Sequence, residues 1–197
     1  MKYSPKAPGP ILRECSLKTH DYQVDPYIGC EHHCHYCYAL NTAETDWTKE
    51  IQYYEDIAAR LEKELEDIPR QRIYMGYMTD AYQPCEADLC QTRKVLELLE
   101  GKGFSASILT KSDLVLRDLD VLAEMENANV SVSVSFDESA RKLFEGNTME
   151  TERRIQALKQ CKEAGLSTSA LLCPVIPYVT DAEAMVERIA PYVARVW

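Results

Sequence analysis

Apolar residues along the chain fall into two patterns, short runs and longer stretches with an apolar position at every third or fourth residue. The short runs have the length and the β-branched or aromatic content of strands, and they predict strands at 71–78, 104–109, 130–136 and 167–173. The longer stretches are typical of amphipathic helices, and they predict helices at 50–67, 88–100, 113–126 and 152–164. A fifth helix is expected at 181–193, beginning at Asp181 and disturbed by Pro191.

The regular alternation of strands and helices decides the fold class. It predicts successive right-handed βαβ units, and therefore an α/β fold with a parallel sheet. Residues 22–29 supply the first strand and loop, and 194–197 resemble the opening of a sixth strand, so we expect the sequence to stop within an element. A shortened chain and a minimal last strand both fit. Residues 1–20, mildly basic and with three prolines, are expected to form an extended lead-in to a core domain at 21–197.

The strand at 130–136 carries more information than the others. Val130, Val132 and Val134 alternate with three serines, whereas a parallel strand buried on both faces is usually apolar throughout. One face is expected to pack on helices and the other to be lined with hydroxyl groups. A hydroxyl-lined inner face fits an open or partial barrel that holds a polar ligand, because a closed barrel core is filled with branched aliphatic residues.

The composition, net charge and cysteine count exclude several classes of protein. The 197 residues are 46% hydrophobic and hold no apolar run long enough to span a bilayer and no signal peptide, so a cytoplasmic protein without a membrane partner is expected. Lys and Arg number 22 against 32 Asp and Glu, and the net charge of −10 weighs against a surface that follows nucleic-acid phosphates. Eight cysteines without a secretion signal indicate metal binding rather than disulfides.

The densest chemistry is the segment Cys30-Glu-His-His-Cys34-His-Tyr-Cys37. Three thiols within eight residues of one loop can surround a single centre. A tetrahedral zinc site would need a fourth ligand, which one of the three neighbouring histidines could supply. A four-iron cluster is the competing interpretation, because thiolates hold such clusters and three protein ligands would leave one iron open.

The C-x3-C-x2-C spacing, with an aromatic residue before the last cysteine, resembles the signature of the radical S-adenosylmethionine (SAM) superfamily. The resemblance extends over roughly residues 20 to 190. Five segments follow one another in the order and spacing of the spore photoproduct lyase-like group, often labelled DNA repair photolyases: DPYIGCEHHCHYCYA, YMTDAYQPCE, SILTKSDLVLRDLDVL, VSVSVSF and AGLSTSALLCPVIPYVTD.

This resemblance implies a partial (β/α)6 TIM-like barrel that ends at the start of strand 6. It also implies a [4Fe–4S] cluster held by Cys30, Cys34 and Cys37, with SAM on the open iron. A one-electron donor such as flavodoxin or ferredoxin would reduce the cluster, and reductive cleavage of SAM would give a 5′-deoxyadenosyl radical that abstracts hydrogen from a substrate. The residues that the resemblance assigns to SAM are Tyr36, Thr79, Asp80, Lys111, Ser133 or Ser135, and, more weakly, Arg154.

The match departs from that group at the hydrogen donor. In spore photoproduct lyases a thiol near the end of the second strand returns hydrogen to the product with help from tyrosines. Tyr77 stands where that thiol is expected, so Cys85 becomes the candidate donor. Tyr38 of the cysteine loop and Tyr77 are the other candidate catalytic residues. The alternatives of a DNA lesion lyase and of a non-catalytic zinc-binding module therefore stay open. DNA is possible but disfavoured as a substrate, since the lead-in carries +3 and residues 21–197 carry −13.

Overall fold

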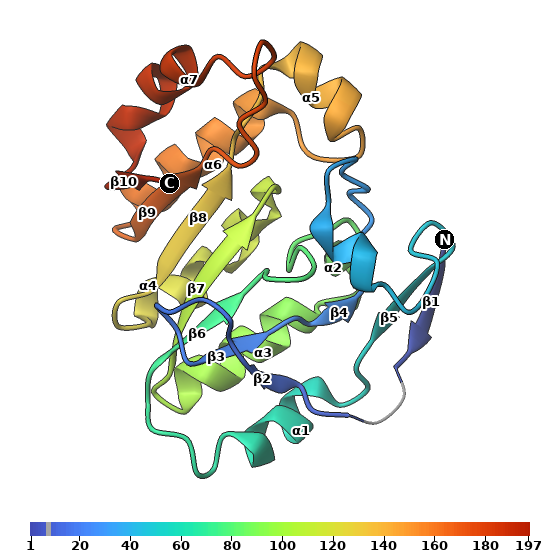
Figure 1. The fold of residues 1–197 in the computed structure, drawn as a ribbon. Helices are drawn as coiled ribbons and strands as arrows, with labels where there is room; N and C mark the ends of the chain where they lie inside the picture. The colour runs from blue at the N-terminus through green and yellow to red at the C-terminus, as the bar shows by residue number, and fades with distance from the viewer. Residues whose placement is uncertain (7–8) are drawn as a thin grey trace.

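The computed structural model describes residues 1–6 and 9–197, so residues 7 and 8 of the expected lead-in lie outside the described residues. Its main sheet has seven strands within this part of the chain, in the order β10-β9-β8-β7-β6-β3-β2 (Figure 1). Six of them run parallel: β3 (Tyr22–Val24), β6 (Arg72–Met75), β7 (Ser105–Thr110), β8 (Asn129–Ser133), β9 (Ser167–Leu171) and β10 (Arg195–Val196). The seventh, β2 (Leu12–Glu14), pairs antiparallel with β3. This open sheet confirms the α/β fold and the partial TIM-like barrel.

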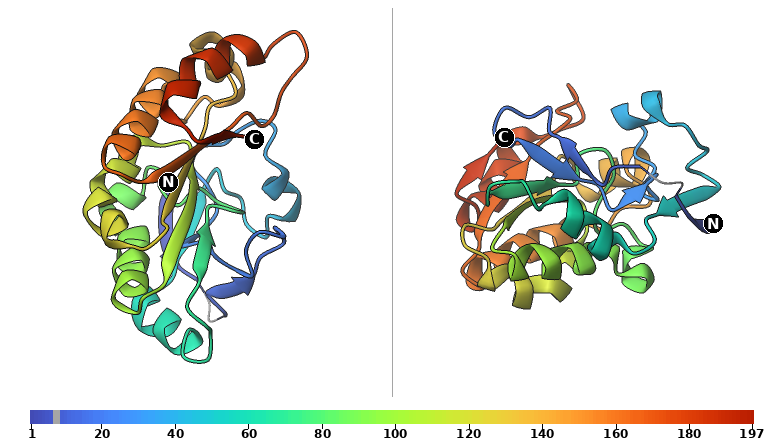
Figure 2. Two further views of the ribbon diagram at one scale, coloured as in Figure 1. Left: turned by 90° about the vertical axis from the view of Figure 1, so that its left-hand side faces the viewer. Right: turned by 90° about the horizontal axis from the view of Figure 1, so that it is seen from below.

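Helices cover one face of the sheet, and the N-terminal segments lie against the other face (Figure 2, left). The covering helices are α1 (Ile57–Glu64), α3 (Gln91–Gly101), α4 (Leu119–Glu124), α6 (Thr151–Glu163) and α7 (Ala182–Ile189). Val130 and Val132 of β8 and Leu158 of α6 are fully buried. Each such side chain contributes roughly 1.5–3 kcal/mol by leaving water. The valine face predicted for 130–136 is therefore the helix-covered face.

A small second sheet, ordered β1-β5-β4, corrects the predicted helix at 50–67. Residues Glu50–Tyr53 form strand β5, between β1 (Lys2–Pro5) and β4 (Tyr27–Ile28). Helix α1 begins only at Ile57, after Asp56 in the left-handed region at φ 50°. The apolar side chain of Ile51 fits the strand as well as the helix pattern, and here it packs on Tyr27. Strand pairing with β1 and β4 therefore decides the structure of residues 50–53, although their apolar spacing also fits a helix.

Three other predicted helices begin or end differently. Cys90, with φ 51°, divides the segment predicted at 88–100 into α2 (Glu86–Leu89) and α3. The segment predicted at 113–126 starts as the 3-10 helix η2 (Asp113–Asp118) before α4. Pro191 lies in the 3-10 turn η3 (Ala190–Tyr192), which follows α7. Helix α5 (Glu138–Phe144) was not predicted, although the Asp137 carboxylate accepts from the backbone N–H of Ala140 as an N-cap.

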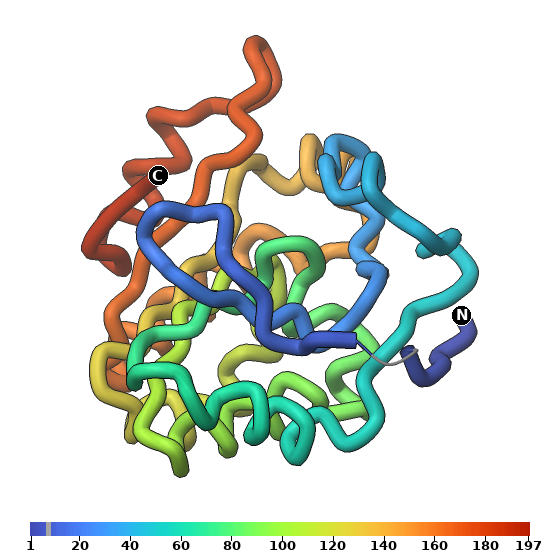
Figure 3. The backbone as a smooth tube through the Cα atoms, turned by 60° about the horizontal axis from the view of Figure 1, so that its bottom comes forward, coloured from blue at the N-terminus to red at the C-terminus, as the bar shows by residue number. Residues whose placement is uncertain are grey.

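The backbone tube shows the cysteine-bearing segment, in light blue, at the edge of the molecule beside the tan segment that carries α5 (Figure 3). That segment ends in the 3-10 helix η1 (Tyr38–Thr42). Among the described residues, the helices are all too short or too polar to cross a bilayer.

Candidate active site

Cys30, Cys34 and Cys37 line one cavity of about 370 Å³. Its other walls come from residues at or just after the carboxyl ends of strands β6, β7 and β8, including Thr79, Lys111 and Ser133. In open and closed α/β barrels, ligands bind at the carboxyl ends of the parallel strands. The structure therefore brings the predicted cysteine loop and the predicted strand-end residues to one place.

The cysteine loop is held at both ends by hydrogen bonds to distant segments. Before Cys30, Gly29 has φ +96°, and a Cβ there would lie 2.9 Å from Ile51 Cδ1, so this position favours glycine. The amide of Gln83 donates to the Gly29 carbonyl at 2.9 Å and accepts from the Glu31 N–H at 2.9 Å. Within the loop, the His35 N–H donates to the Phe144 carbonyl at 2.9 Å. These hydrogen bonds place the loop beside the strand ends.

The thiols of Cys30 and Cys34 sit in a low-polarity environment. Burial raises the pKa of Cys34 to about 11, and the nearby Lys111 ammonium opposes that rise. Burial also raises the pKa of Cys30. A bound metal centre would supply the positive charge that a thiolate needs here. Within residues 1–6 and 9–197, no three His, Cys, Asp or Glu side chains are grouped as they would be around one metal ion.

Asp80 is fully engaged by the protein. Its carboxylate accepts from the Tyr82 N–H at 2.8 Å, the Thr110 hydroxyl at 2.7 Å and the Lys111 N–H at 2.7 Å. His32 Nε2 lies 3.1 Å from the same carboxylate. Burial opposes ionisation of Asp80, but the His32 ring and these hydrogen bonds outweigh it and lower the pKa to about 2. Asp80 thus connects the cysteine loop to the strand ends through hydrogen bonds.

His32 is the residue of the cysteine loop that contacts Asp80. Its Nδ1 lies 3.3 Å from the Asn147 carbonyl oxygen, and its Nε2 faces the Asp80 carboxylate. Both partners are acceptors, so both hydrogen bonds form together only when both ring nitrogens carry protons. The ring is 3% exposed. A hydrogen-bonding role for the histidines beside the cysteines agrees with the sequence, but the sequence did not predict Asp80 as the partner of His32.

Lys111 and Tyr36 lie near each other in the cavity wall. The Lys111 ammonium lies 5.8 Å from the centre of the Tyr36 ring, and both side chains line the cavity. The Tyr36 hydroxyl donates to the Glu145 carboxylate. Glu145 in turn pairs with the Arg154 guanidinium at 2.7 Å.

Arg154 does not line the cavity. Its guanidinium contacts Glu145, the Met149 carbonyl at 2.7 Å and the Ser133 carbonyl at 3.0 Å, and the residue is 1% exposed. Arg154 therefore reaches the site only through Glu145 and the backbone of β8.

The serine face of the fourth predicted strand shows a capacity for ligand binding. The Ser133 hydroxyl lines the cavity, is buried and has no hydrogen-bond partner within the described residues. A buried hydroxyl without a partner is costly, and a bound polar ligand would satisfy it. Ser135 is likewise buried and unpartnered in the described part of the chain, but it is not among the cavity-lining residues. The residues present fit a polar cofactor next to the cysteines.

The candidate hydrogen donors separate in space. Tyr38 and Tyr77 line the cavity with ring centres 6.2 Å apart, and the Tyr38 hydroxyl donates to the Tyr77 carbonyl at 2.6 Å. Cys85 lies elsewhere, packed with Tyr27 and Ile51 and 3% exposed. The exposed Cys173, which follows β9, lines the cavity instead.

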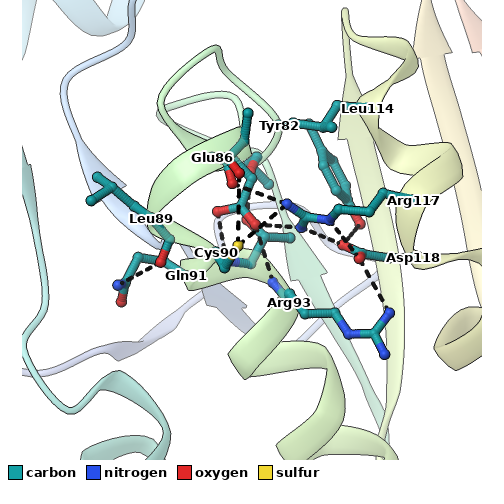
Figure 4. Close-up of polar contacts among 12 residues, drawn as sticks. Tyr82, Glu86, Leu89, Cys90, Gln91, Arg93, Leu114, Arg117 and Asp118 are labelled. Atoms are coloured by element: carbon teal, nitrogen blue, oxygen red, sulfur yellow. Dashed lines mark hydrogen bonds and ion pairs between the residues drawn. The ribbon is translucent and has the colours of Figure 1, made fainter.

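A buried ionic network anchors the segment that follows Asp80 (Figure 4). Arg117 pairs with Glu86 at 2.5 Å and with Asp118 at 2.7 Å, and both carboxylates are fully buried. The Tyr82 hydroxyl donates to Asp118 at 3.0 Å. This network ties the segment carrying Tyr82 and Glu86 to η2, which follows Lys111. Arg117 and Asp118 could not be recognised in the sequence, because charged residues of these types are common on ordinary helix surfaces.

An open parallel α/β sheet with a cysteine-lined cavity at its strand ends defines a partial-barrel ligand-binding fold. The chain matches the model of the radical SAM superfamily over residues 24–189, and it belongs to that superfamily. Membership implies a [4Fe–4S] cluster and SAM.

Two curated relatives match most of the chain. An uncharacterized protein of Methanocaldococcus jannaschii is 33% identical over 177 residues, covering 87% of this chain and 66% of that protein. An uncharacterized protein of Mycobacterium tuberculosis is 31% identical over 186 residues, covering 88% and 55%. The chain therefore spans less than two thirds of the length of these relatives.

Solved structures share the fold. A spore photoproduct lyase mutant has a TM-score of 0.68 at 19% identity, over 89% of this chain and 52% of that one. Spore photoproduct lyase complexed with dinucleoside spore photoproduct has a TM-score of 0.66 at 19% identity, over 92% and 52%. A cobalamin-dependent SAM radical enzyme has a TM-score of 0.54 at 13% identity, over 76% and 23%. These likenesses establish a common architecture.

Proposed function

We propose that the chain is the core of a radical SAM enzyme in which Cys30, Cys34 and Cys37 hold a [4Fe–4S] cluster beside bound SAM. When bound, the reduced cluster and SAM supply a 5′-deoxyadenosyl radical that abstracts a hydrogen atom from the substrate. One observation carries the proposal: three thiols, the Lys111 ammonium and the unpartnered Ser133 hydroxyl meet in one cavity at the strand ends. A small one-electron donor such as flavodoxin or ferredoxin would act as the partner.

The cavity residues bind and orient. Lys111 offers a positive charge to a carboxylate, Ser133 offers a free hydroxyl, and Tyr36 offers an aromatic face. Asp80 and Arg154 are positioning residues in this proposal. Asp80 fixes the Lys111 backbone through its N–H, and Arg154 holds the Glu145 carboxylate that accepts from Tyr36.

The test is anaerobic reconstitution followed by assays for iron, sulfide and 5′-deoxyadenosine under dithionite with SAM. We expect iron and sulfide near four per chain and dithionite-dependent 5′-deoxyadenosine. Cys34→Ala is expected to abolish both the cluster and the product. Cys15→Ala is the matched control, because Cys15 is not among the cavity-lining residues.

Two outcomes would contradict the proposal. A colourless protein holding one zinc would support the zinc-binding module instead. Equal 5′-deoxyadenosine from Cys34→Ala and the unmodified chain would show that the cysteine loop does not hold the cluster.

A further inference from the structure

A second cavity of about 600 Å³ lies on the same inner face of the sheet, toward the amino ends of the strands. It shares Leu17, Tyr74 and Leu171 with the cysteine-lined cavity. The two spaces therefore adjoin along the strands. We call the second one the basic cavity, because Lys18, Arg72 and Arg195 line it.

The floor of the basic cavity is polar because of the sheet register. Residues of one row pair across four strands, Tyr74 with Ser107, Ser107 with Asn129, and Asn129 with Ser167. In the next row Ser131 pairs with Ser169, and their hydroxyls lie 2.6 Å apart. The serine and asparagine side chains of this floor are Ser107, Asn129, Ser131, Ser167 and Ser169.

This floor differs from an ordinary barrel core. Alternate residues of a strand face the same side, so Ser131 and Ser133 of β8 face inward together with Asn129. Barrel interiors of this kind are usually filled by Val, Ile and Leu. Hydroxyl and amide groups at these positions serve a hydrogen-bonding ligand better than they serve packing.

The charge around the basic cavity opposes the charge of the whole chain. Lys18, Arg72 and Arg195 line it, and no Asp or Glu does so among the described residues. The full sequence has 32 acidic against 22 basic residues. Within residues 1–6 and 9–197, none of these three cations forms a salt bridge. Three cations without carboxylate partners around a polar floor make a local site for an anion.

Aromatic side chains connect the two cavities. Ring centres are 6.2 Å apart between Tyr38 and Tyr77, 6.3 Å between Tyr77 and Tyr74, and 5.1 Å between Tyr74 and His20. This row begins at the cysteine-lined cavity and ends at the basic cavity. It gives flat apolar contact to a ligand that reaches from one to the other.

We propose that the basic cavity binds a small hydroxylated phosphate ester, a sugar phosphate or a mononucleotide, as the substrate class of the adjoining site. The cations meet the phosphate, and the serine and asparagine groups meet the hydroxyls. The volume suits one small ligand, and the net charge of −10 opposes a long polyphosphate. The substrate role rests on the proposed function, whereas binding by itself does not.

The experiment is calorimetric titration of the reconstituted chain with ribose 5-phosphate in the presence of saturating SAM. Saturable binding is expected for ribose 5-phosphate, and binding weaker by about tenfold or more is expected for ribose, because loss of a charge-assisted contact costs at least about 1.4 kcal/mol. Arg72→Gln and Arg195→Gln are expected to weaken binding by about tenfold each. Lys63→Gln, an exposed position on α1, removes the same charge away from the cavity and is expected to change nothing.

The outcomes separate this proposal from the proposed function. Absence of saturable binding, or equal weakening by Lys63→Gln and Arg72→Gln, would overturn the cavity assignment even if 5′-deoxyadenosine forms. Binding without any 5′-deoxyadenosine formation would overturn the substrate role. A short oligothymidylate that binds more tightly than ribose 5-phosphate would overturn the assignment to a small molecule and favour nucleic acid.

Discussion

Gly76 lies between β6 and the Thr79–Asp80 segment, with φ +96°, and a Cβ there would clash with the Leu109 carbonyl oxygen. We predict that Gly76→Ala lowers the free energy of unfolding by at least about 2 kcal/mol, since the left-handed backbone and the backbone clash add. It should also reduce 5′-deoxyadenosine formation, because the displaced turn carries Asp80. Urea denaturation and the product assay check both effects.

Gly101→Ala is the matched control. Gly101 ends α3, and a Cβ there would meet no atom within 4 Å. A helical alanine is favoured over glycine by about 0.5–1 kcal/mol, so this change should be neutral or stabilising. Equal losses from the two substitutions would contradict the steric argument for Gly76.

The pairing of Asp80 with His32 predicts a pH-dependent stability. The lowered Asp80 pKa means that its ionised form stabilises the fold at pH values above the unfolded-state pKa near 3.9, and that this contribution is lost as the pH falls toward about 2. Asp80→Asn should therefore cost about 2–3 kcal/mol at pH 6 and distinctly less at pH 3. Urea denaturation of both proteins at the two pH values gives the difference. A difference that does not change with pH would show that Asp80 acts through hydrogen bonding alone.

At the scale of elements, Arg117 makes η2 and α2 into one unit. Removing its guanidinium leaves Glu86 and Asp118 fully buried with fewer partners. Breaking a buried ion pair by deleting one partner costs about 3–5 kcal/mol, so Arg117→Gln should lower the free energy of unfolding by about that amount.

The comparison for Arg117 is Arg153→Gln, whose guanidinium is 57% exposed and pairs with Asp113 at 2.6 Å. A surface pair contributes at most about 1 kcal/mol. Chemical denaturation of the two variants measures the contrast. Similar small losses from both would mean that solvent or other side chains compensate the Glu86 and Asp118 carboxylates.

Most main-sheet strands could be predicted from the sequence, because their runs have the length and residue content of strands. Strand β2 could not, because residues 1–20 were expected to form an extended lead-in. The serine and valine alternation at 130–136 even assigned the two faces of β8 correctly. Residues 50–53 could not be assigned, because the pairing partners of β5 are β1 and β4, which are distant in sequence. Local pattern therefore fails where partners from elsewhere in the chain choose between two possible structures.

The residues of the candidate site also divide into those that the sequence could predict and those that it could not. The three cysteines were recognisable from spacing, and the structure brings Thr79, Lys111 and Ser133 to them. The positions of Arg154 and Cys85 could not be predicted. Both residues belong to segments close to the site, but Arg154 pairs with Glu145 and Cys85 packs on Tyr27 and Ile51. Motif order gives the element on which a residue lies, and packing alone decides which cavity its side chain reaches.

At the scale of the whole molecule, the cysteine loop connects the segment after β6 with the end of α5. It contacts Gln83 after β6, and its His35 and Glu31 backbones bond to Phe144 and Asn147 around the end of α5. The main sheet has its own buried core of branched side chains on the helix-covered face. Loop and sheet should therefore differ in how strongly they depend on a bound cluster.

If residues 30–37 hold the proposed cluster, we predict that removing it by anaerobic chelation raises hydrogen exchange in this loop and leaves β7 and β8 protected. Without the cluster the loop keeps only a few hydrogen bonds, whereas the β7 and β8 amides stay in the parallel ladder. Peptide-resolved exchange of reconstituted and chelated protein measures this, and reconstituted Cys15→Ala should behave as the unmodified chain does. Equal increases across β7, β8 and the loop would show that cluster and sheet fold as one unit, and no increase in the loop would show that protein contacts alone hold it.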